Sequence, residues 1–330
     1  MKIIVDAMGG DYAPLEIVKG AVLAVAELDV NIILSGDEQK INQVFDENKL
    51  SRKNIEIIHT DMVITMEDDP LSVVKTHKDS SMGLAFSALV EDRGDALVSA
   101  GNTGAILSAS TLIVKRIKGI KRAALGVVLP YERKTLLIDA GASVDVNAES
   151  LKQFGFMGSI YMKKIFNIDS PSVGLANNGT EQNKGTPEHV QAYKLLSETK
   201  NINFIGNIEG KEITTNCSDV LVTDGFTGNM ILKLTEGFGL FMNKTLKNIF
   251  LKDAFSKISA VFVQGSLKDL KESFDYSEYG GVPLFGVKKP VIKAHGNSNA
   301  KAIKNAIRQA KFCVETKIVD EIEYQTEINR

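Results

Sequence analysis

The chain has 330 residues, 44% of them hydrophobic, and a formal net charge of -2. This length and composition suit one large or two ordinary globular domains, and the balanced charge provides no basic field for binding nucleic acid. The two cysteines, Cys217 and Cys313, match no metal-binding spacing, so we expect neither a metal centre nor a disulfide framework. No apolar run approaches the ~18 residues of a membrane-spanning helix, and the first run is too short for a signal peptide, so we expect a cytoplasmic protein.

Strand-like and helix-like stretches alternate along the chain, which predicts parallel βαβ units. In chain order, we expect strands over 2–8, 31–35, 55–59, 96–99, 124–129, 135–139, 173–176, 203–207, 220–223 and 290–294. Apolar spacing predicts helices over 14–28 (with Pro14 in its first position), 79–91, 103–115, 150–166, 187–198, 227–249 and 300–316. The turn-like segment 130–134 indicates a hairpin, so the sheet should be mixed.

The chain has no low-complexity linker and no simple repeat. We therefore expect a single interwoven α/β domain over residues 1–330, with a weak internal division near 141–149. In such a domain, segments far apart in the sequence can contribute to one ligand site.

One pattern recurs along the chain: an apolar strand ends in a loop of Gly, Asn, Asp, Ser or Thr. The loops are 9–11, 101–104, 141–143, 177–180, 224–229 and 295–299. Ligands of open α/β sheets bind outside the carboxyl ends of the strands. Glycines let backbone N–H groups approach an anion, and helix N-termini add partial positive charge. The repeated loops therefore predict one anion-binding cleft assembled from much of the chain.

Each loop alone has a simpler interpretation, in which its Asp, Asn or Ser caps the following helix. The repetition favours phosphate binding over capping, because a helix N-terminus with hydroxyl and amide groups can bind phosphate. The candidate phosphate ligands are Gly9, Gly10, Asp11, Lys75, Asn102, Thr103, Gly104, Gly225, Thr227, Gly228, Asn229, Gly296, Ser298 and Asn299.

Two further residues are candidates for acid–base or electrostatic roles. Lys184 lies in the polar loop 183–186, where a lysine suits an oxyanion, although an exposed loop lysine is the simpler interpretation. His295 lies between a strand and a polar loop and could donate a proton, but a structural role is equally compatible with its spacing. The sequence contains no dinucleotide fingerprint, no P-loop and no nucleophile elbow.

One segment, 250–265, reads as an amphipathic surface helix. Its apolar residues Leu251, Phe255, Ile258 and Phe262 recur at helical spacing, with lysines between them. It could pack on the core, on a dimer partner or on a membrane surface. The short, mildly basic pattern by itself favours the core or a dimer partner.

Several motifs resemble, in order, those of the bacterial phosphate acyltransferase (PlsX) family. They are VDAMGGD at 5–11, SAGNTGA at 99–105, GNIEG at 206–210, DGFTGN at 224–229, YGGVPL at 279–284 and AHGNSNAK at 294–301. Together they extend over nearly the whole chain and are highly specific. One departure is Ser143, where the resemblance leads us to expect Asn.

The resemblance implies transfer of a long-chain fatty acyl group from acyl carrier protein to inorganic phosphate. The product, an acyl phosphate, would feed phospholipid synthesis, without a cofactor. It also implies a three-layer α/β/α sandwich with a mostly parallel, mixed sheet, similar to phosphate acetyltransferases and isopropylmalate dehydrogenases. The family is usually dimeric and peripherally associated with the membrane, where a downstream glycerol-phosphate acyltransferase would be a partner.

Such a reaction requires orientation and oxyanion stabilisation more than a covalent relay, since phosphate is a nucleophile and a thioester is activated. We expect Lys184 and His295 to stabilise the oxyanion or protonate the leaving thiolate. Asp6, Asp11 and Asp224 would orient these cations. The acidic carrier could dock on Lys115–Arg116 or on the basic face of the helix at 300–316.

Two alternatives remain open from the sequence. One is a related enzyme, either a coenzyme A-dependent phosphate acetyltransferase-like protein or a dehydrogenase of similar fold. The other is a membrane-associated scaffold of lipid-synthesis enzymes, which the many glycine- and asparagine-rich loops argue against.

Overall fold

The computed structural model describes residues 1–131, 133–215, 218–253, 255–256, 259, 262–263, 265 and 280–328. In this part of the chain, eleven strands form a single mixed sheet. The strand order is β3 (Ile55–His59), β2 (Asn31–Gly36), β1 (Lys2–Asp6), β4 (Ala96–Ser99), β11 (Val291–Ala294), β10 (Gly281–Phe285), β5 (Ala124–Leu129), β6 (Thr135–Ile138), β9 (Val220–Val222), β7 (Ser172–Asn177) and β8 (Asn203–Glu209).

The direction of the strands changes in the middle of the sheet. Strand β10 is antiparallel to both β11 and β5, and β5 is antiparallel to β6. The strands β1, β2, β3, β4 and β11 are mutually parallel, as are β6, β7, β8 and β9. The parallel strands of the two halves therefore run in opposite directions.

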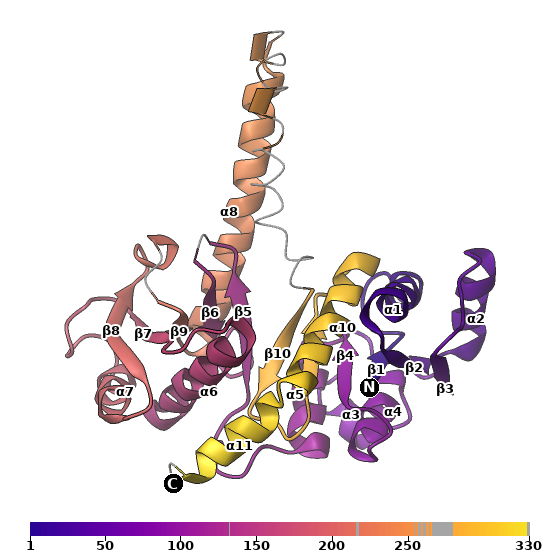
Figure 1. Cartoon of the computed structure of the whole chain (residues 1–330), viewed down its shortest axis with the longest axis horizontal. Helices are drawn as coiled ribbons and strands as arrows, with labels where there is room; N and C mark the ends of the chain where they lie inside the picture. The colour runs from indigo at the N-terminus through magenta and orange to yellow at the C-terminus, as the bar shows by residue number, and fades with distance from the viewer. Residues whose placement is uncertain are drawn as a thin grey trace.

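Helices cover both faces of the sheet (Figure 1). On one face lie α1 (Leu15–Leu28), α2 (Glu38–Glu47), α6 (Ala148–Phe166), α7 (Pro187–Glu198), α10 (Ala300–Glu315) and α11 (Ile318–Ile328). On the other face lie α3 (Ser72–Lys75), α4 (Ser81–Val90) and α5 (Thr103–Ala109), which continues into a π-helical turn over Ser110–Val114.

The strands are apolar on both faces because both faces are covered. In β1, Ile3 and Val5 pack into one core layer and Ile4 into the other. Helix α6 packs closely on β9 because Gly158 has no side chain: a Cβ there would lie 2.6 Å from a methyl carbon of Val220. The molecule is therefore the three-layer α/β/α sandwich expected from the sequence.

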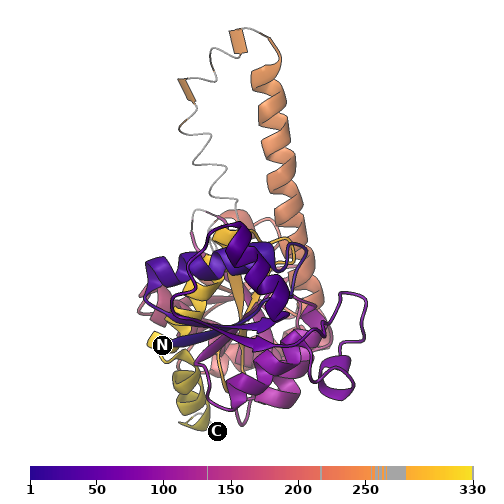
Figure 2. The same cartoon turned by 90° about the vertical axis from the view of Figure 1, so that its right-hand side faces the viewer.

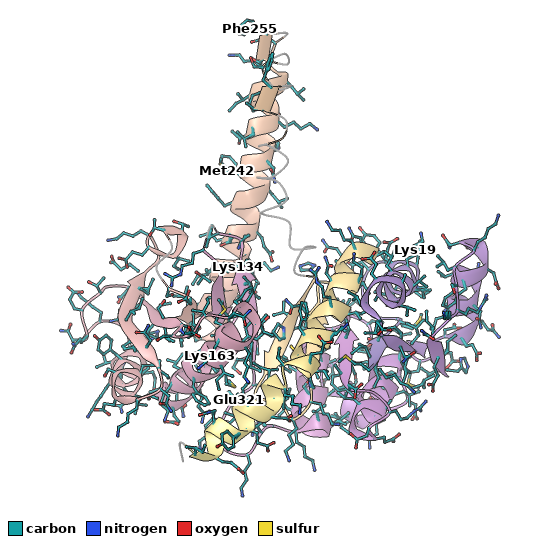
Figure 3. All side chains as sticks on the ribbon, in the orientation of Figure 1. Lys19, Lys134, Lys163, Met242, Phe255 and Glu321 are labelled. Atoms are coloured by element: carbon teal, nitrogen blue, oxygen red, sulfur yellow. The ribbon has the colours of Figure 1, made fainter. Side chains whose placement is uncertain are left out.

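Helix α8 (Gly225–Leu251) departs from this layered arrangement. Its first turns pack on the body, where Tyr131 Oη lies 2.9 Å from Thr235 Oγ1. Its remaining turns project away from the sandwich, as two views at right angles agree (Figures 1 and 2). Met242 lies part-way along the projection and Phe255 near its far end (Figure 3). No helix of the described residues is long and apolar enough to cross a membrane.

Most predicted elements are confirmed, including the β5–β6 hairpin and the mixed sheet. Two details are wrong. Pro14 precedes α1 as its N-cap instead of occupying its first position, and the helix predicted over 103–115 changes to π geometry at Ser110. Elements α2, α3, α11 and β10 were not predicted. The division near 141–149 stays a prediction; this segment connects β6 to α6.

Candidate active site

A cavity of about 740 Å³ lies where the two halves of the sheet meet. Strands β5 and β10 pair only at Leu125–Leu284 and Ala124–Phe285 among the described residues, although each strand continues beyond these pairs. The sheet is therefore open between Gly126–Val128 of β5 and Gly281–Pro283 of β10, and these segments line the cavity.

The polar wall of the cavity comes from loops of both halves. From the first half come Asp11, Thr103 and the loop after β11, and from the second half Gly141 and Asn229. The predicted site residues among the lining are Asp11, Thr103, Asn229, His295, Gly296, Ser298 and Asn299. The structure thus brings together much of the predicted anion-binding cleft.

Glycines let the loops of the first half approach closely. Gly10 has a φ of +105°, and the Asp11 amide donates to Gly296 O at 2.8 Å. A Cβ on Gly9 would lie 2.7 Å from the Gly101 nitrogen. Side chains at Gly9 and Gly10 would therefore separate the loops after β1, β4 and β11.

Asp6 links the loops after β1 and β4 through hydrogen bonds. Its carboxylate accepts from Ser99 Oγ at 2.7 Å and from the Met8 amide at 3.3 Å, and the Ser99 hydroxyl accepts from the Gly101 amide at 3.1 Å. Burial raises the pKa of Asp6 above its ordinary value, and these hydrogen bonds oppose the rise. No cation of the described residues is paired with Asp6, so its geometry is that of a loop support.

Three of the predicted site residues, two phosphate ligands and the catalytic candidate Asp224, cap helices. Asn102 Oδ1 accepts from the Ala105 amide, Asn299 Oδ1 from the Ala302 amide, and Asp224 Oδ1 from the Thr227 amide, at 3.1, 3.0 and 2.8 Å. Asn102 also donates to Thr65 O and Met66 O, and the other oxygen of Asp224 accepts from Thr227 Oγ1. These side chains are occupied by the fold, which leaves backbone N–H groups and neighbouring residues for a ligand.

Asp139, which the sequence analysis did not select, supports the cavity wall without lining it. Its buried carboxylate accepts from the backbone amides of Leu125, Gly141, Ala142 and Ser143, at 2.9, 3.1, 2.9 and 2.7 Å. Burial raises its pKa above the ordinary value, against the effect of these bonds. Asp139 therefore fixes the loop after β6, and Ser143 takes part through its backbone.

The loop held by Asp139 in turn receives the start of α8. The Gly225 amide donates to Ser143 O at 2.8 Å. A Cβ on Gly228 would lie 1.9 Å from Asp139 O, so only glycine fits there. Gly225 and Gly228 thus have packing roles that bring Asn229 to the cavity wall.

Lys293 is the second residue that the sequence analysis missed. It lies on β11, is 9% exposed and lines the cavity. Its ammonium donates to Ala294 O, and no carboxylate of the described residues pairs with it. Burial lowers its pKa to about 8, while Asp11 opposes the decrease and Lys233 adds to it. A buried, unpaired cation beside a cavity favours binding of an anion.

Ser298 lies in the same wall and has a hydroxyl without a partner. The residue is 5% exposed, and its Oγ makes no hydrogen bond. It precedes the N-terminus of α10, which begins at Ala300. Buried hydroxyls usually make a hydrogen bond, so this hydroxyl is available to donate to an oxygen in the cavity. His295, exposed at the rim, is in the same loop.

Several predicted ligands lie outside the cavity wall. Lys184 is exposed in the loop after β7, where its backbone carbonyl accepts from Asn177 Nδ2 at 3.1 Å. Lys75 is exposed at the end of α3, and Gly104 packs against Pro70. Their roles stay predictions. In the described part of the chain, no group of three or more His, Cys, Asp or Glu residues could hold a metal.

The sequence comparisons identify the family. The model of the family described as "Fatty acid synthesis protein" matches residues 1–321. The chain belongs to this family. Relatives named phosphate acyltransferase occur in Oceanobacillus iheyensis, at 47% identity over 98% of this chain and 96% of theirs, and in Alkaliphilus oremlandii, at 46% over 98% and 96%. A third, from Thermoanaerobacterium thermosaccharolyticum, is 43% identical over 99% of this chain and 97% of its own.

Solved structures with the same fold include phosphotransacylases and a dehydrogenase. A phosphotransacetylase from Streptococcus pyogenes superposes with a TM-score of 0.62 at 16% identity, covering 97% of this chain and 94% of its own. A 4-hydroxythreonine-4-phosphate dehydrogenase from Klebsiella pneumoniae gives 0.57 at 12% identity, covering 95% and 99%. At these identities the likeness concerns the fold alone. It confirms the predicted fold class.

Proposed function

We propose that this protein transfers a long-chain fatty acyl group from acyl carrier protein to inorganic phosphate. The observation that carries the proposal is one cavity that is polar and cationic at one end and apolar at the other. Lys293, Ser298 and the start of α10 form an anion-binding wall, and apolar residues of β5 and β10 line the adjoining opening in the sheet. Relatives named phosphate acyltransferase along the full chain support this assignment.

In the proposed reaction, a phosphate oxygen attacks the thioester carbonyl carbon and forms a C–O bond. The tetrahedral intermediate then breaks its C–S bond, giving acyl phosphate and the carrier thiolate, which takes up a proton. Lys293 and Ser298 would hold the phosphate, and the N-terminus of α10 would add partial positive charge. His295 at the rim would protonate the thiolate.

No covalent relay through a described cysteine is required. Burial raises the pKa of the Cys313 thiol to about 12, so it is protonated and unreactive. Lys184 remains a second candidate for oxyanion stabilisation. It does not line the cavity, so the loop after β7 would have to move to bring its ammonium to the substrate.

For the carrier, we favour the α10 side of the cavity over Lys115–Arg116. Asn299 and Ala302 at the start of α10 line the cavity, and Lys301 belongs to the same turn of this helix. Lys304, one turn further, pairs with Glu27 at 2.7 Å. Arg116 instead forms a β-bridge with Val287, which follows the end of β10 that is paired with β5. Basic side chains near the opening would guide an acidic carrier.

Helix α8 is the proposed dimer contact. Phe226, Met230, Leu234, Phe238 and Phe241 recur every three or four residues along it and are 54–74% exposed. Burying each on a partner would contribute about 1.5–3 kcal/mol, and a second copy offers the same stripe. We therefore propose a homodimer formed through α8.

The segment beyond α8 is the proposed membrane contact. Leu251 is the last residue of α8 instead of part of a separate helix. Phe255 and Phe262 are 82% and 85% exposed, which supports a contact outside the core of their own chain. Ile258 lies outside the described residues. The two phenylalanines would insert into the bilayer surface. A downstream glycerol-phosphate acyltransferase stays a predicted partner.

A thiol-release assay tests the activity. Purified protein is mixed with palmitoyl–acyl carrier protein, with and without inorganic phosphate, and acyl phosphate is trapped with hydroxylamine. We expect thiol release that depends on phosphate, together with the hydroxamate. Phosphate-independent release would indicate a thioesterase, and activity with acetyl-coenzyme A alone would favour the coenzyme A-dependent alternative. A protein inactive in every arm would favour the scaffold.

A further inference from the structure

The cavity extends through the sheet. On one side its wall includes Asn229, Leu232 and Lys233 of α8. On the other side it includes Tyr161 of α6 and Gln309 of α10, which belong to the opposite helical layer. A continuous wall on both sides requires a passage between β5 and β10, where these strands are unpaired.

The sides of this passage are apolar. Val127 and Val128 of β5 and Val282 and Pro283 of β10 border the opening and line the cavity, and Leu125 lines it where the two strands are paired. The anion-binding residues Lys293 and Ser298 are at its other end. An amphipathic substrate with a charged reacting group and a hydrocarbon chain matches this division.

Tyr161 closes the passage. Its ring is fully buried, its Oη donates to Gln309 Oε1 at 3.4 Å, and it packs edge-to-face on Phe285 with 5.2 Å between ring centroids. Behind it is a second space of about 20 Å³, lined by Tyr161 and Pro283 together with Cys313, Ile318 and Ile322. Tyr161 thus stands between the main cavity and further apolar packing space.

We propose that the passage holds the acyl chain and that Tyr161 is the residue that limits its length. The inference rests on the proposed acyl transfer. The thioester carbonyl lies near Lys293 and Ser298, and the chain runs between β5 and β10 until its methyl end meets the Tyr161 ring. A chain too long for this distance leaves methylenes in water or distorts the wall, and either reduces transition-state binding.

The test compares kcat/KM for lauroyl-, myristoyl-, palmitoyl- and stearoyl–acyl carrier protein. Tyr161→Leu removes the ring that ends the passage and opens it toward the smaller space lined by Cys313 and Ile322. The chain length with the highest kcat/KM should therefore increase by one step of the series. In this variant, the ratio of kcat/KM for the longer chain to kcat/KM for the chain that the wild type prefers should rise about tenfold, the effect of burying two methylenes. Tyr161→Phe keeps the ring and should keep the wild-type optimum.

A second variant acts in the opposite direction. Val282→Phe narrows the passage and should move the optimum to a shorter chain, which keeps the inference testable even if Tyr161→Leu does not fold. Tyr193→Leu is the matched control: Tyr193 packs on Phe204, with 5.0 Å between ring centroids, and does not line the cavity. Its chain-length profile should equal that of the wild type.

The outcomes distinguish a failure of the chain-length inference from a failure of the proposed acyl transfer. Phosphate-dependent activity in the wild type, with optima that move in opposite directions in the two variants, supports the inference. An active wild type whose optimum is unchanged in folded Tyr161→Leu and in Val282→Phe overturns it and leaves the acyltransferase proposal intact. An inactive wild type refutes the proposed function itself.

Discussion

At the residue scale, Lys293 combines burial with charge. Its pKa of about 8 means that the ammonium loses its proton just above neutral pH. If Lys293 holds phosphate, kcat/KM for phosphate should fall as the pH rises through about 8, by about tenfold per pH unit. Lys293→Met should abolish this fall and raise the KM for phosphate roughly ten- to a hundredfold.

The same group affects stability in a defined direction. Folding lowers the pKa of Lys293 from 10.5 to about 8, so between these pH values the unfolded chain binds the extra proton. The free energy of unfolding contributed by this group therefore rises with pH in that window and is constant below it. Urea titrations of the wild type and Lys293→Met measure the difference. A wild-type kcat/KM for phosphate that does not fall above about pH 8, together with an unchanged phosphate KM in Lys293→Met, would remove Lys293 from the site.

Asp224 allows a test of capping against catalysis. Both of its oxygens bind Thr227, so Asp224→Ala should lower the free energy of unfolding by about 1 kcal/mol. Asp224→Ser provides another good N-cap and should recover most of that loss together with activity. Stable Asp224→Ser protein with a large loss of kcat would instead favour the sequence-based prediction that Asp224 orients a cation.

At the element scale, α8 makes the dimer testable. Leu234→Glu with Phe238→Glu places two charges in the exposed stripe, at positions 74% and 54% exposed. We expect a dimeric wild type and a folded, monomeric variant by light scattering after gel filtration, because the charges would be buried in the interface. Asn243→Glu adds a charge to the opposite side of the same helix and should remain dimeric. A monomeric wild type would contradict the proposal.

The end of the projection can be tested separately from the dimer. Leu251→Glu with Phe255→Glu should reduce flotation with phosphatidylglycerol-containing liposomes while the protein stays dimeric. Tyr324→Glu with Ile328→Glu is the matched control, since it removes two exposed apolar side chains of α11, at 60% and 59% exposure. Equal flotation of wild type and tip variant would refute the membrane contact; loss of the dimer would assign these residues to the partner interface.

At the scale of the whole molecule, the cavity links the two halves of the sheet. Loops after β1, β4 and β11 meet loops after β6 and β9 around it. Phosphate at about a hundred times its Kd should add about 2.7 kcal/mol to the free energy of unfolding, and raise Tm by roughly 5 °C. Calorimetry should show this increase for the wild type, and only about 0.4–1.4 kcal/mol for Lys293→Met at the same phosphate concentration. An equal increase in both would locate the phosphate elsewhere.

The sequence alone determined much of the architecture. Apolar strands alternating with amphipathic helices predicted the α/β layers because burial on two faces and on one stripe leave different periods in the sequence. The glycine- and asparagine-rich loops identified most of the cavity's polar wall, since positions such as Gly10 and Gly228 admit no side chain.

Asp11 was predicted from its loop, but only the tertiary structure brings Lys293 to the cavity wall and Asp139 to its support. The sequence analysis chose lysines in polar loops, such as Lys184, whereas Lys293 lies within the apolar strand Val291–Ala294 and lines the cavity. A single lysine among buried apolar residues was the available signal for Lys293, as was a carboxylate closing an apolar strand for Asp139. Neither signal specifies which other segments of the chain these two side chains meet in the folded protein. The opening between β5 and β10 arises from long-range strand pairing, and a local pattern carries no information about where such pairing stops.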